Sequence, residues 1–321
     1  MEYSVAIRTL GTSPDTLRRE LECLNNQTIK PRKVCIYIAE GYLAPDFRVA
    51  DEVYISVPKG MIAQRALDYS EIDTPYILML DDDVTLERDS AEELLAIIDS
   101  NGLDAVVADV FLNHEMGFLS KTKALLTAGV RPLFGQKKAI RVYGSGTFGY
   151  INNPVKDWYY TESGAGPAAM WRKDSWLALD MKDELWMDKM RFSYGDDQLT
   201  FNKAYRRGMA TAMAFRTGFV HVDARSASNR FRGTPEWLAN RITGIYLLWH
   251  RSCYRPTHGM ARTRARLGFF GRSFLLAGSY LALGVKTFSI KPVFAYFRGL
   301  SRGKKIARSN EFRNLNPFLR Q

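Results

Sequence analysis

The chain has 321 residues, of which 46% are hydrophobic and 25% charged, and this composition is normal for a globular protein with a buried core. Its three cysteines, Cys23, Cys35 and Cys253, form no CxxC pair and no disulfide framework. This excludes a disulfide-stabilised secreted scaffold and predicts a reducing, cytosolic setting. The first residues, MEYSVAIRTLG, carry no basic segment and too short an apolar run to predict a signal peptide.

The net charge of +11 is unevenly distributed along the chain. The segment from Arg225 to Gln321 carries 19 Lys and Arg against only Glu236 and Glu311, a net +17, whereas residues 1–224 sum to −6. A nearly neutral body with a strongly basic end indicates that the end meets something anionic, either a membrane surface or a nucleic acid. We therefore predict an α/β domain over residues 1–224 and a basic, amphipathic helical extension over residues 225–321.

Strands and helices are expected to alternate over about the first 112 residues. The expected strands are Ser4–Ile7, Val34–Ile38, Val53–Val57, the run that ends at Asp81, and Ala105–Phe111. The first expected helix begins at Ser13-Pro14, with Ser13 as its N-cap. A second is expected over Met61–Tyr69, and a third begins at Ser90 through a capping box with Glu93. This alternation predicts an α/β fold with a Rossmann-like, doubly wound and mostly parallel sheet.

The stretch Thr74–Arg88, TPYILMLDDDVTLER, stands out within this pattern. The apolar run Tyr76–Leu80 reads as a buried strand, and Asp81, Asp82 and Asp83 follow it directly. Three neighbouring carboxylates need a counter-charge, and a divalent cation is the usual one. Ligands of open α/β sheets bind at the carboxyl ends of strands. The stretch thus predicts a metal-assisted site for a phosphate-bearing ligand; the alternative is a solvated acidic turn that caps the next helix.

The middle of the chain gives weaker signals. Lys121–Gly129 is compatible with a helix. The segment Gly144–Gly149, GSGTFG, is flexible by composition and is either a substrate loop or a plain surface loop. The segment Glu162–Trp171, ESGAGPAAMW, would let a ligand approach the backbone closely, or is only a turn.

A second acidic feature lies in MRFSYGDDQLTFNKAYRRG, where Gly195 precedes Asp196 and Asp197 at the start of an expected helix. These acids either only stabilise the helix dipole or provide a general base beside an anionic substrate. Further on, His221 lies among apolar residues in the expected strand Phe219–Val222. It is therefore either a satisfied core histidine or a ligand for an ion such as Mn²⁺.

The extension contains an aromatic, amphipathic segment, Trp237–Trp249, and then the apolar stretch LGFFGRSFLLAGSYLALGV, residues 267–285. Arg272 interrupts this stretch and leaves only Ser273–Val285 without charge, which is shorter than the roughly 20 residues that a membrane span needs. We therefore expect a helix that lies on a membrane surface, flanked by Lys and Arg, rather than one that crosses it.

With these residues described, the chain resembles a family 2 glycosyltransferase of the nucleotide-sugar-binding GT-A type over roughly residues 3–224. The resemblance rests on the order of the first strands and helices, on the DxD-bearing run LMLDDDV, and on GDDQLT at residues 195–200. It implies that Asp81, with Asp82 beside it, lies towards the nucleotide ribose, that Asp83 and also Asp81 bind the metal, and that Asp197 is the catalytic base beside Asp196. His221 falls where many such enzymes place a metal-binding histidine.

The sequence departs from the family pattern at three places. Glu40 stands where the family often has an Asp-rich turn that reads the nucleobase, so Glu40 is its possible replacement. Gln64-Arg65-Ala66 replaces the common Arg-Asn pair and keeps only Arg65, as a donor-binding residue. No QxxRW motif of processive polymerases follows Asp197, which favours transfer of a single sugar.

The resemblance implies an inverting transfer assisted by Mn²⁺ or Mg²⁺, from a UDP- or GDP-sugar to a hydroxyl of a glycan or lipid-linked acceptor. The setting would be bacterial polysaccharide or lipid-linked glycan assembly. The enzyme would be cytoplasmic and held by its basic extension on the inner face of the plasma membrane, with no nucleic-acid partner.

Two alternatives remain at this point. The residues Asp81-Asp82-Asp83-Val84-Thr85 also fit the DxDxT motif of haloacid-dehalogenase-type phosphatases, although that motif usually follows the first strand and is followed by a further acid at a set spacing. A non-enzymatic protein that binds membranes or nucleic acid through its basic extension is the other alternative. The extension has no zinc-finger or RNA-binding aromatic motif.

Overall fold

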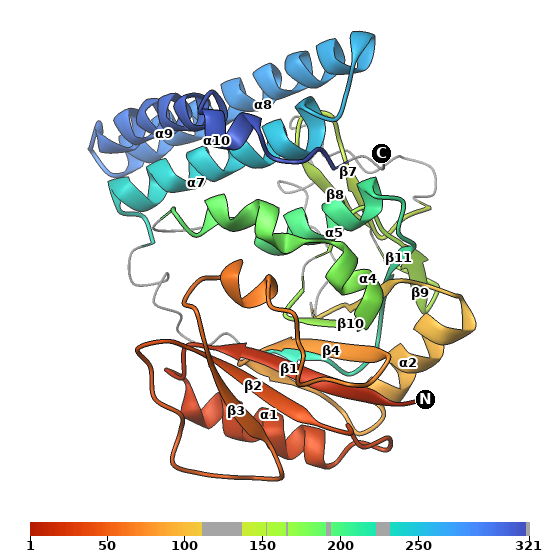
Figure 1. The fold of residues 1–321 in the computed structure, drawn as a ribbon. Coiled ribbons are helices and arrows are strands. Elements are labelled where there is room, and N and C mark those ends of the chain that lie inside the picture. Colours follow the sequence, from red (N-terminus) through yellow and green to blue (C-terminus); the bar gives the residue numbers. More distant parts are fainter. Residues whose placement is uncertain (111–136, 152, 165, 191–193, 223–231, 319–321) are drawn as a thin grey trace.

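The structure is a computed structural model that describes residues 1–110, 137–151, 153–164, 166–190, 194–222 and 232–318. An eight-stranded sheet lies at its centre, in the order β3-β2-β1-β4-β10-β6-β11-β9 (Figure 1). Its strands are β1 (Tyr3–Thr9), β2 (Val34–Ala39), β3 (Val53–Val57), β4 (Tyr76–Asp81), β6 (Ala105–Ala108), β9 (Trp158–Tyr160), β10 (Ala168–Arg172) and β11 (Thr211–Ala214).

The sheet is mostly parallel. The neighbours β3, β2, β1 and β4 are parallel to one another, and β11 is parallel to β6. Strand β10 is inserted antiparallel between β4 and β6, and β9 is antiparallel at the edge. The order reverses beside β1, as in other doubly wound sheets, and the prediction of a Rossmann-like α/β fold with a helical C-terminal region is confirmed.

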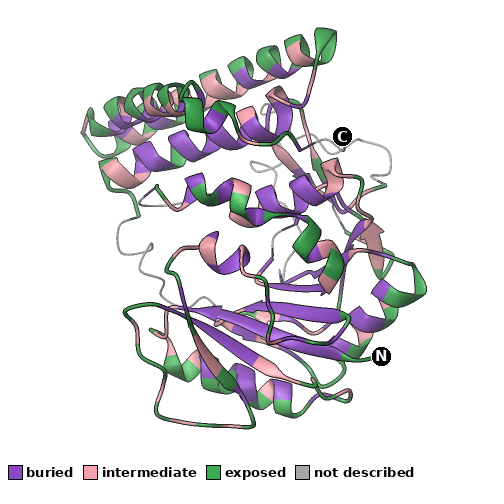
Figure 2. Cartoon of the chain, viewed as in Figure 1, coloured by how far each residue is buried: buried purple, intermediate pink, exposed green. Residues whose placement is uncertain are grey.

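Both faces of the sheet are covered, because successive residues of each strand point to opposite faces. On β4, Leu78 and Leu80 join one buried cluster with helices α1 (Pro14–Asn25) and α2 (Ser90–Ser100). Ile77 and Met79 join a second cluster, on the other face. The elements on that face are η1 (Ala63–Arg65), α4 (Lys173–Ala178), η2 (Met181–Met187) and α5 (Asp196–Arg206). Figure 2 shows the purple, buried strands between these two layers.

The C-terminal helices form a third layer above α5 (Figure 1). They are α7 (Pro235–Trp249), a π-helical turn η3 (His250–Tyr254), α8 (Gly259–Lys286), α9 (Lys291–Ala307) and α10 (Asn310–Arg313). Helix α7 is largely buried between α9 and the α/β domain, whereas α8 is largely exposed (Figure 2). The expected domain boundary between residues 224 and 225 lies outside the described residues.

Among the contacts that join the C-terminal helices to the α/β domain, two sets involve residues singled out in the sequence or deeply buried. The hairpin of β7 (Ile140–Val142) and β8 (Phe148–Tyr150) contains the Gly-rich turn, whose Gly144 carbonyl accepts a 3.0 Å hydrogen bond from Trp249 Nε1. This turn is therefore covered by helices and is not a plain surface loop. In addition, the buried Glu184 of η2 pairs with Arg251 at 2.7 Å and with Lys203 of α5 at 3.1 Å.

Several local predictions were wrong. Met61–Tyr69 contains only the three-residue turn η1. Helix α2 has Asp89 as its N-cap without a side-chain cap, so the capping box of Ser90 and Glu93 is absent. The strand expected at 105–111 ends at Ala108. The helix expected at 121–129 lies outside the described residues.

Helix α8 differs from the expectation based on its charge-free run. It has 28 residues, and by length and composition it is apolar enough to cross a membrane. Only 17% of its most apolar stretch is buried. The helix packs on the protein along one stripe that includes Ala265, Phe269 and Tyr280, and Phe269 stacks on Trp249 with ring centroids 4.1 Å apart.

Candidate active site

The carboxyl ends of β1 and β4 bring the first acid into place. These strands are parallel neighbours, and their register sets Arg8 beside Asp81. The Arg8 guanidinium lies 2.9 Å from Asp81 Oδ1, and the Arg8 side chain is only 6% exposed. Asp81 is therefore a partly buried carboxylate that a buried cation holds in place, and it does more than form a solvated acidic turn.

Asp82 is held by the segment that follows β1. The hydroxyl of Thr9 donates to its carboxylate, and the hydroxyl of Thr16 on α1 donates to its backbone carbonyl at 2.9 Å. Burial raises the pKa of Asp82 to about 6, with the hydrogen bond from Thr9 opposing the rise and the neighbours Asp83 and Asp81 adding to it. Burial is thus the main effect on Asp82, and repulsion by its two neighbouring carboxylates adds to it.

Asp83 and His221 are brought together by a short two-stranded sheet. Strand β5 (Val84–Thr85) pairs with β12 (Val220–His221), in a register that sets His221 opposite Val84. The Val222 amide donates to the Asp83 carbonyl at 2.8 Å, which fixes the backbone on both sides. As a result, Nε2 of His221 lies 3.1 Å from Oδ1 of Asp83. His221 is exposed on the site and is not a core histidine.

Asp196 and Asp197 form the first turn of α5. Gly195 precedes them with φ +79°, a left-handed conformation that glycine adopts without strain. A Cβ at that position would collide with the Leu248 side chain. Both carboxylates contact the same guanidinium nitrogen of Arg65, each at 2.7 Å. The acids therefore bind a buried cation and do more than cap a helix.

The protonation of this group follows from its enclosure. Burial raises the pKa of Asp197 to about 7; Asp196 adds to the rise and Arg65 opposes it. Burial lowers the pKa of the Arg65 guanidinium, but Asp196 and Asp197 outweigh it, so that the pKa is raised and Arg65 stays charged. A carboxylate with a pKa near 7 is well suited to general base catalysis at neutral pH.

The turn η1 holds Arg65 in position. The carboxylate of Asp188 accepts hydrogen bonds from the backbone amides of Ile62 and Ala63, both at distances of 2.8–3.2 Å, at the start of the turn. The adjacent Gln64 donates to the carbonyls of Thr9 and Tyr37. These contacts fix η1 between the sheet and α5, so Arg65 reaches α5 from a rigid support.

These residues surround one cavity of about 680 Å³ at the carboxyl edge of the sheet. All but one of the predicted site residues line it: Arg65, Asp81, Asp82, Asp83, Asp196, Asp197 and His221. Glu40 is exposed in the turn after β2 and is not among the lining residues. The prediction that Glu40 reads a nucleobase therefore has no support from this cavity.

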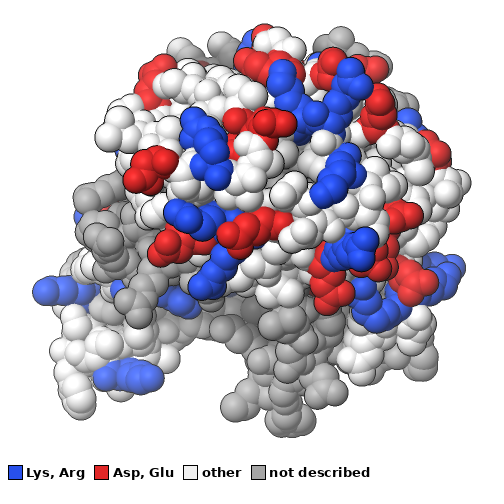
Figure 3. All heavy atoms as spheres, turned by 90° about the horizontal axis from the view of Figure 1, so that it is seen from below, with Lys and Arg blue, Asp and Glu red and all other residues white. Residues whose placement is uncertain are grey.

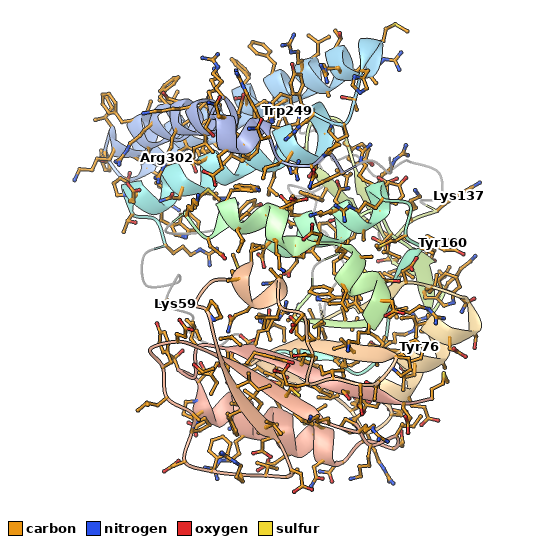
Figure 4. All side chains as sticks on the ribbon, in the orientation of Figure 1. Lys59, Tyr76, Lys137, Tyr160, Trp249 and Arg302 are labelled. Atoms are coloured by element: carbon orange, nitrogen blue, oxygen red, sulfur yellow. The ribbon has the colours of Figure 1, made fainter. Side chains whose placement is uncertain are left out.

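Sequence reasoning missed other residues of the cavity. Arg8 and Thr9 end β1, and Tyr42 and Lys59 lie on the loops after β2 and β3. The Lys59 ammonium donates to the Tyr42 hydroxyl at 3.0 Å; Lys59 is labelled in Figure 4. The carboxyl edges of parallel strands are the signal that could have found them, since β1, β2 and β3 end at the same edge of the sheet as β4.

The donor set suits a hard divalent cation. Oδ1 of Asp83 is buried, and besides its 3.1 Å contact with His221 Nε2 it has no hydrogen-bond partner within the described part of the chain. An octahedral ion with ligands about 2.1 Å away separates neighbouring ligand atoms by about 3 Å, close to the spacing of Asp83 and His221. Among the described residues, no group of three His, Cys, Asp or Glu side chains is placed to bind one metal ion. Oxygens of the bound substrate would therefore complete the coordination of the ion.

Comparison with known proteins adds little to this geometry. No family model matches the sequence, and no curated protein matches it. Among solved structures, the chain is similar to Staphylococcus aureus TarS at 12% identity and a TM-score of 0.48, over 85% of this chain and 44% of that one. It is also similar to TarS 1-349 at 13% identity and 0.49, over 95% and 90%. Similarity at this level assigns no family and no activity to this chain.

Proposed function

We propose that the protein is an inverting glycosyltransferase that moves one sugar from a UDP- or GDP-sugar to a hydroxyl of a glycan or lipid-linked acceptor. One observation carries the proposal: a single cavity holds strand-end carboxylates, a histidine beside Asp83, and a carboxylate, Asp197, with a pKa near 7. These are the groups needed to bind a nucleoside diphosphate through an ion and to activate a hydroxyl.

The donor would bind along the carboxyl edge of the sheet. Asp83 and His221 would hold Mn²⁺ or Mg²⁺, which acts as a Lewis acid and neutralises the leaving diphosphate. Arg8 and Lys59 line the same cavity and can bind phosphate oxygens, while Tyr42 offers an aromatic face to the nucleobase. Asp81 and Asp82, held by Arg8 and Thr9, would face the ribose hydroxyls.

The transfer itself requires one proton acceptor. Asp197 takes the proton of the acceptor hydroxyl as its oxygen attacks the anomeric carbon. The bond between that carbon and the diphosphate oxygen breaks, and its electron pair leaves with the diphosphate. A single displacement of this kind inverts the anomeric configuration. Arg65 keeps Asp197 oriented, and Asp196 shares the same cation.

We also propose that the enzyme is cytoplasmic and peripheral on the inner face of the plasma membrane. Large apolar side chains are exposed on α8, on α9 and at the turn between them: Leu267, Phe270, Phe274, Leu281, Val285, Phe288, Ile290, Phe294 and Phe297. Basic residues accompany them on both helices. Because α8 packs on α7 and α9 along one stripe, this hairpin would lie on a membrane surface rather than cross it.

The experiment that tests the activity measures release of nucleoside diphosphate from a panel of UDP- and GDP-sugars with Mn²⁺, using a bacterial membrane lipid extract as acceptor. We expect release that depends on both the metal and the extract. In parallel, p-nitrophenyl phosphate should not be hydrolysed. Hydrolysis of this phosphomonoester without turnover of any nucleotide sugar would show that the phosphatase alternative is correct.

A further inference from the structure

The helical extension contains a second cavity, separate from the one at the sheet edge. It measures about 460 Å³ and is enclosed by α7, η3, α8, α9 and α10, close to Trp249 in Figure 4. Its described lining contains four arginines, Arg255, Arg266, Arg308 and Arg313, and no acidic residue. A cavity with this composition concentrates positive charge, which favours binding of an anionic ligand.

The positive charge of this cavity is not neutralised from within the described part of the extension. Its two acids are engaged elsewhere: Glu236 pairs with Arg298 and Arg302, and Glu311 pairs with Lys189. Arg266 instead lies over the ring of Tyr254, with its guanidinium carbon 5.1 Å from the ring centroid. Arg266, Arg308 and Arg313 have no carboxylate partner among the described residues.

The walls of the cavity are rigid. Arg255 donates to the carbonyls of Phe312, Arg313 and Leu315 at 2.9, 2.6 and 2.5 Å, and these bonds fix α10 against η3. His250 also lines the cavity, and its Nδ1 is buried without a hydrogen-bond partner in the described residues. These bonds hold Arg255 and α10 in place before any ligand binds, which lowers the cost of ordering on binding.

The apolar surface of the extension begins one helical turn from this cavity. Arg266, Phe270 and Phe274 follow one another at intervals of four residues on α8, so they lie along one face of the helix. Phe270 is 74% and Phe274 73% exposed. The antiparallel α9 adds Phe294 and Phe297, also exposed, nearer to the turn that joins the helices. A ligand that fills the cavity and follows this stripe needs an anionic head and an apolar tail.

We propose that the arginine cavity binds the phosphate head group of a single anionic phospholipid, whose acyl chains lie over Phe270 and Phe274. Free phosphate would use only the cations, and a nucleic acid would leave the apolar stripe exposed. The proposal rests on the membrane attachment proposed above and not on sugar transfer. It adds a site specific for one lipid molecule to an attachment that otherwise needs only surface charge and apolar burial.

The test is isothermal titration of the full-length protein with dihexanoyl phosphatidic acid, a monomeric lipid in water. We expect saturable binding, and at least about ten-fold weaker affinity in the variant carrying both Arg308→Ala and Arg313→Ala, because each bond to a charged phosphate contributes substantially. The matched control is Arg298→Ala, which removes one arginine of α9 outside the cavity and should bind as the wild type does. Dihexanoyl phosphatidylcholine and inorganic phosphate should bind much more weakly.

Three results would overturn the proposal: unchanged affinity in the double variant, equal loss in the control, or equal binding of inorganic phosphate or heparin. The result is independent of catalysis. The double variant should keep the wild-type thermal shift with Mn²⁺ and nucleotide. The two proposals can therefore fail separately: lipid binding does not require sugar transfer, and sugar transfer does not require this lipid site.

Discussion

At the scale of single residues, the behaviour of Asp197 depends on three opposing effects. Burial raises its pKa, the neighbouring Asp196 raises it further, and the Arg65 cation lowers it, with a result of about 7. The 28% exposed side chain faces the cavity while its other side contacts Arg65. Asp197 is therefore both held in position and able to gain or lose a proton near neutral pH.

The roles of the two acids on α5 can be separated by isosteric substitution. Asp197→Asn keeps the shape but removes the proton acceptor, so we expect a loss of about 10²–10⁴-fold in kcat with donor binding retained. Asp196→Asn should cost less, because Asp196 only shares the Arg65 cation. Steady-state kinetics and donor titration of both variants check this. An equal or reversed order would show that the roles are exchanged.

The pH dependence of the reaction follows from the pKa of the base. Because Asp197 must be deprotonated, kcat/KM should fall as the pH drops below about 7. Arg65→Met removes the cation that lowers this pKa, so the acid limb should move to higher pH, whereas Arg65→Lys should keep it closer to the wild-type position. Circular dichroism verifies that each variant is folded. A limb at the same pH in all three proteins contradicts the assignment of Asp197 as the base.

Much of the site could be predicted from the sequence, because its acids follow unmistakable local patterns. An apolar run ending in Asp81–Asp83 and a Gly195 before two acids each mark a strand end or a helix start. Arg8 and Thr9 carry no such mark; they belong to the site only because β1 pairs with β4. Glu40, the possible replacement for a nucleobase-reading turn, does not line the cavity, and its role stays a prediction, because the course of the loop after β2 is not encoded locally.

At the scale of elements, helix α1 contains an unusual buried acid beneath the site. Glu20 has no exposed surface, and neither carboxylate oxygen has a hydrogen-bond partner in the described residues. Burial raises its pKa well above the usual range, and the nearby Asp82, Asp81 and Asp83 add to this. Burial and the neighbouring acids thus both favour the protonated form of Glu20 in the folded protein, and burying this acid without a partner costs stability.

Replacing this acid should stabilise the protein. Because Glu20 binds a proton in the folded state at a pH where it is ionised in the unfolded chain, its contribution to stability falls as the pH rises above about 4.5. Glu20→Met should raise the free energy of unfolding by about 1–3 kcal/mol, more at pH 8 than at pH 5. Urea unfolding at both values measures this. A destabilised variant, or an equal gain at both, would contradict the protonated state.

The elements that sequence reasoning missed are those set by tertiary contacts. The strands and helices up to β6 have clear periodicity and turn signals, and most of them were predicted. The insertion of β10 antiparallel between β4 and β6 has no local signal, since it depends on which strands pair. The predicted nine-residue helix Met61–Tyr69 is instead the short turn η1. Asp188 accepts hydrogen bonds from its first amides, and Gln64 donates a hydrogen bond to the sheet.

At the scale of the whole molecule, the α/β domain and the helical extension differ in net charge and in exposed apolar surface. The end of the α/β domain seen in Figure 3 carries blue and red side chains interspersed with one another. The helical extension instead combines net positive charge with exposed Phe and Leu. The sequence alone indicated this charge asymmetry. Within the apolar stretch at residues 267–285, however, Phe269 stacks on Trp249 inside the protein.

Membrane attachment should depend on the exposed phenylalanines of the α8–α9 hairpin. Phe270→Glu together with Phe294→Glu should reduce flotation with vesicles containing phosphatidylglycerol, because apolar burial is lost and like charge meets the anionic surface. Val155→Glu, an 84% exposed apolar position on the α/β domain, is the matched control and should bind normally. Wild-type protein should bind neutral vesicles weakly and leave anionic ones at high salt or in alkaline carbonate. Retention through carbonate would show that α8 spans the bilayer.

The central claim, that the cavity at the sheet edge binds a nucleoside diphosphate through an ion held by Asp83 and His221, is tested most directly by thermal shift. Wild-type protein and Asp83→Ala are each melted with UDP or GDP, with and without Mn²⁺. We predict that one nucleotide raises the melting temperature of the wild type only when Mn²⁺ is present, and that Asp83→Ala loses this rise while keeping a cooperative transition. A rise of equal size without the metal or in the variant, or no rise with either nucleotide, would contradict the account.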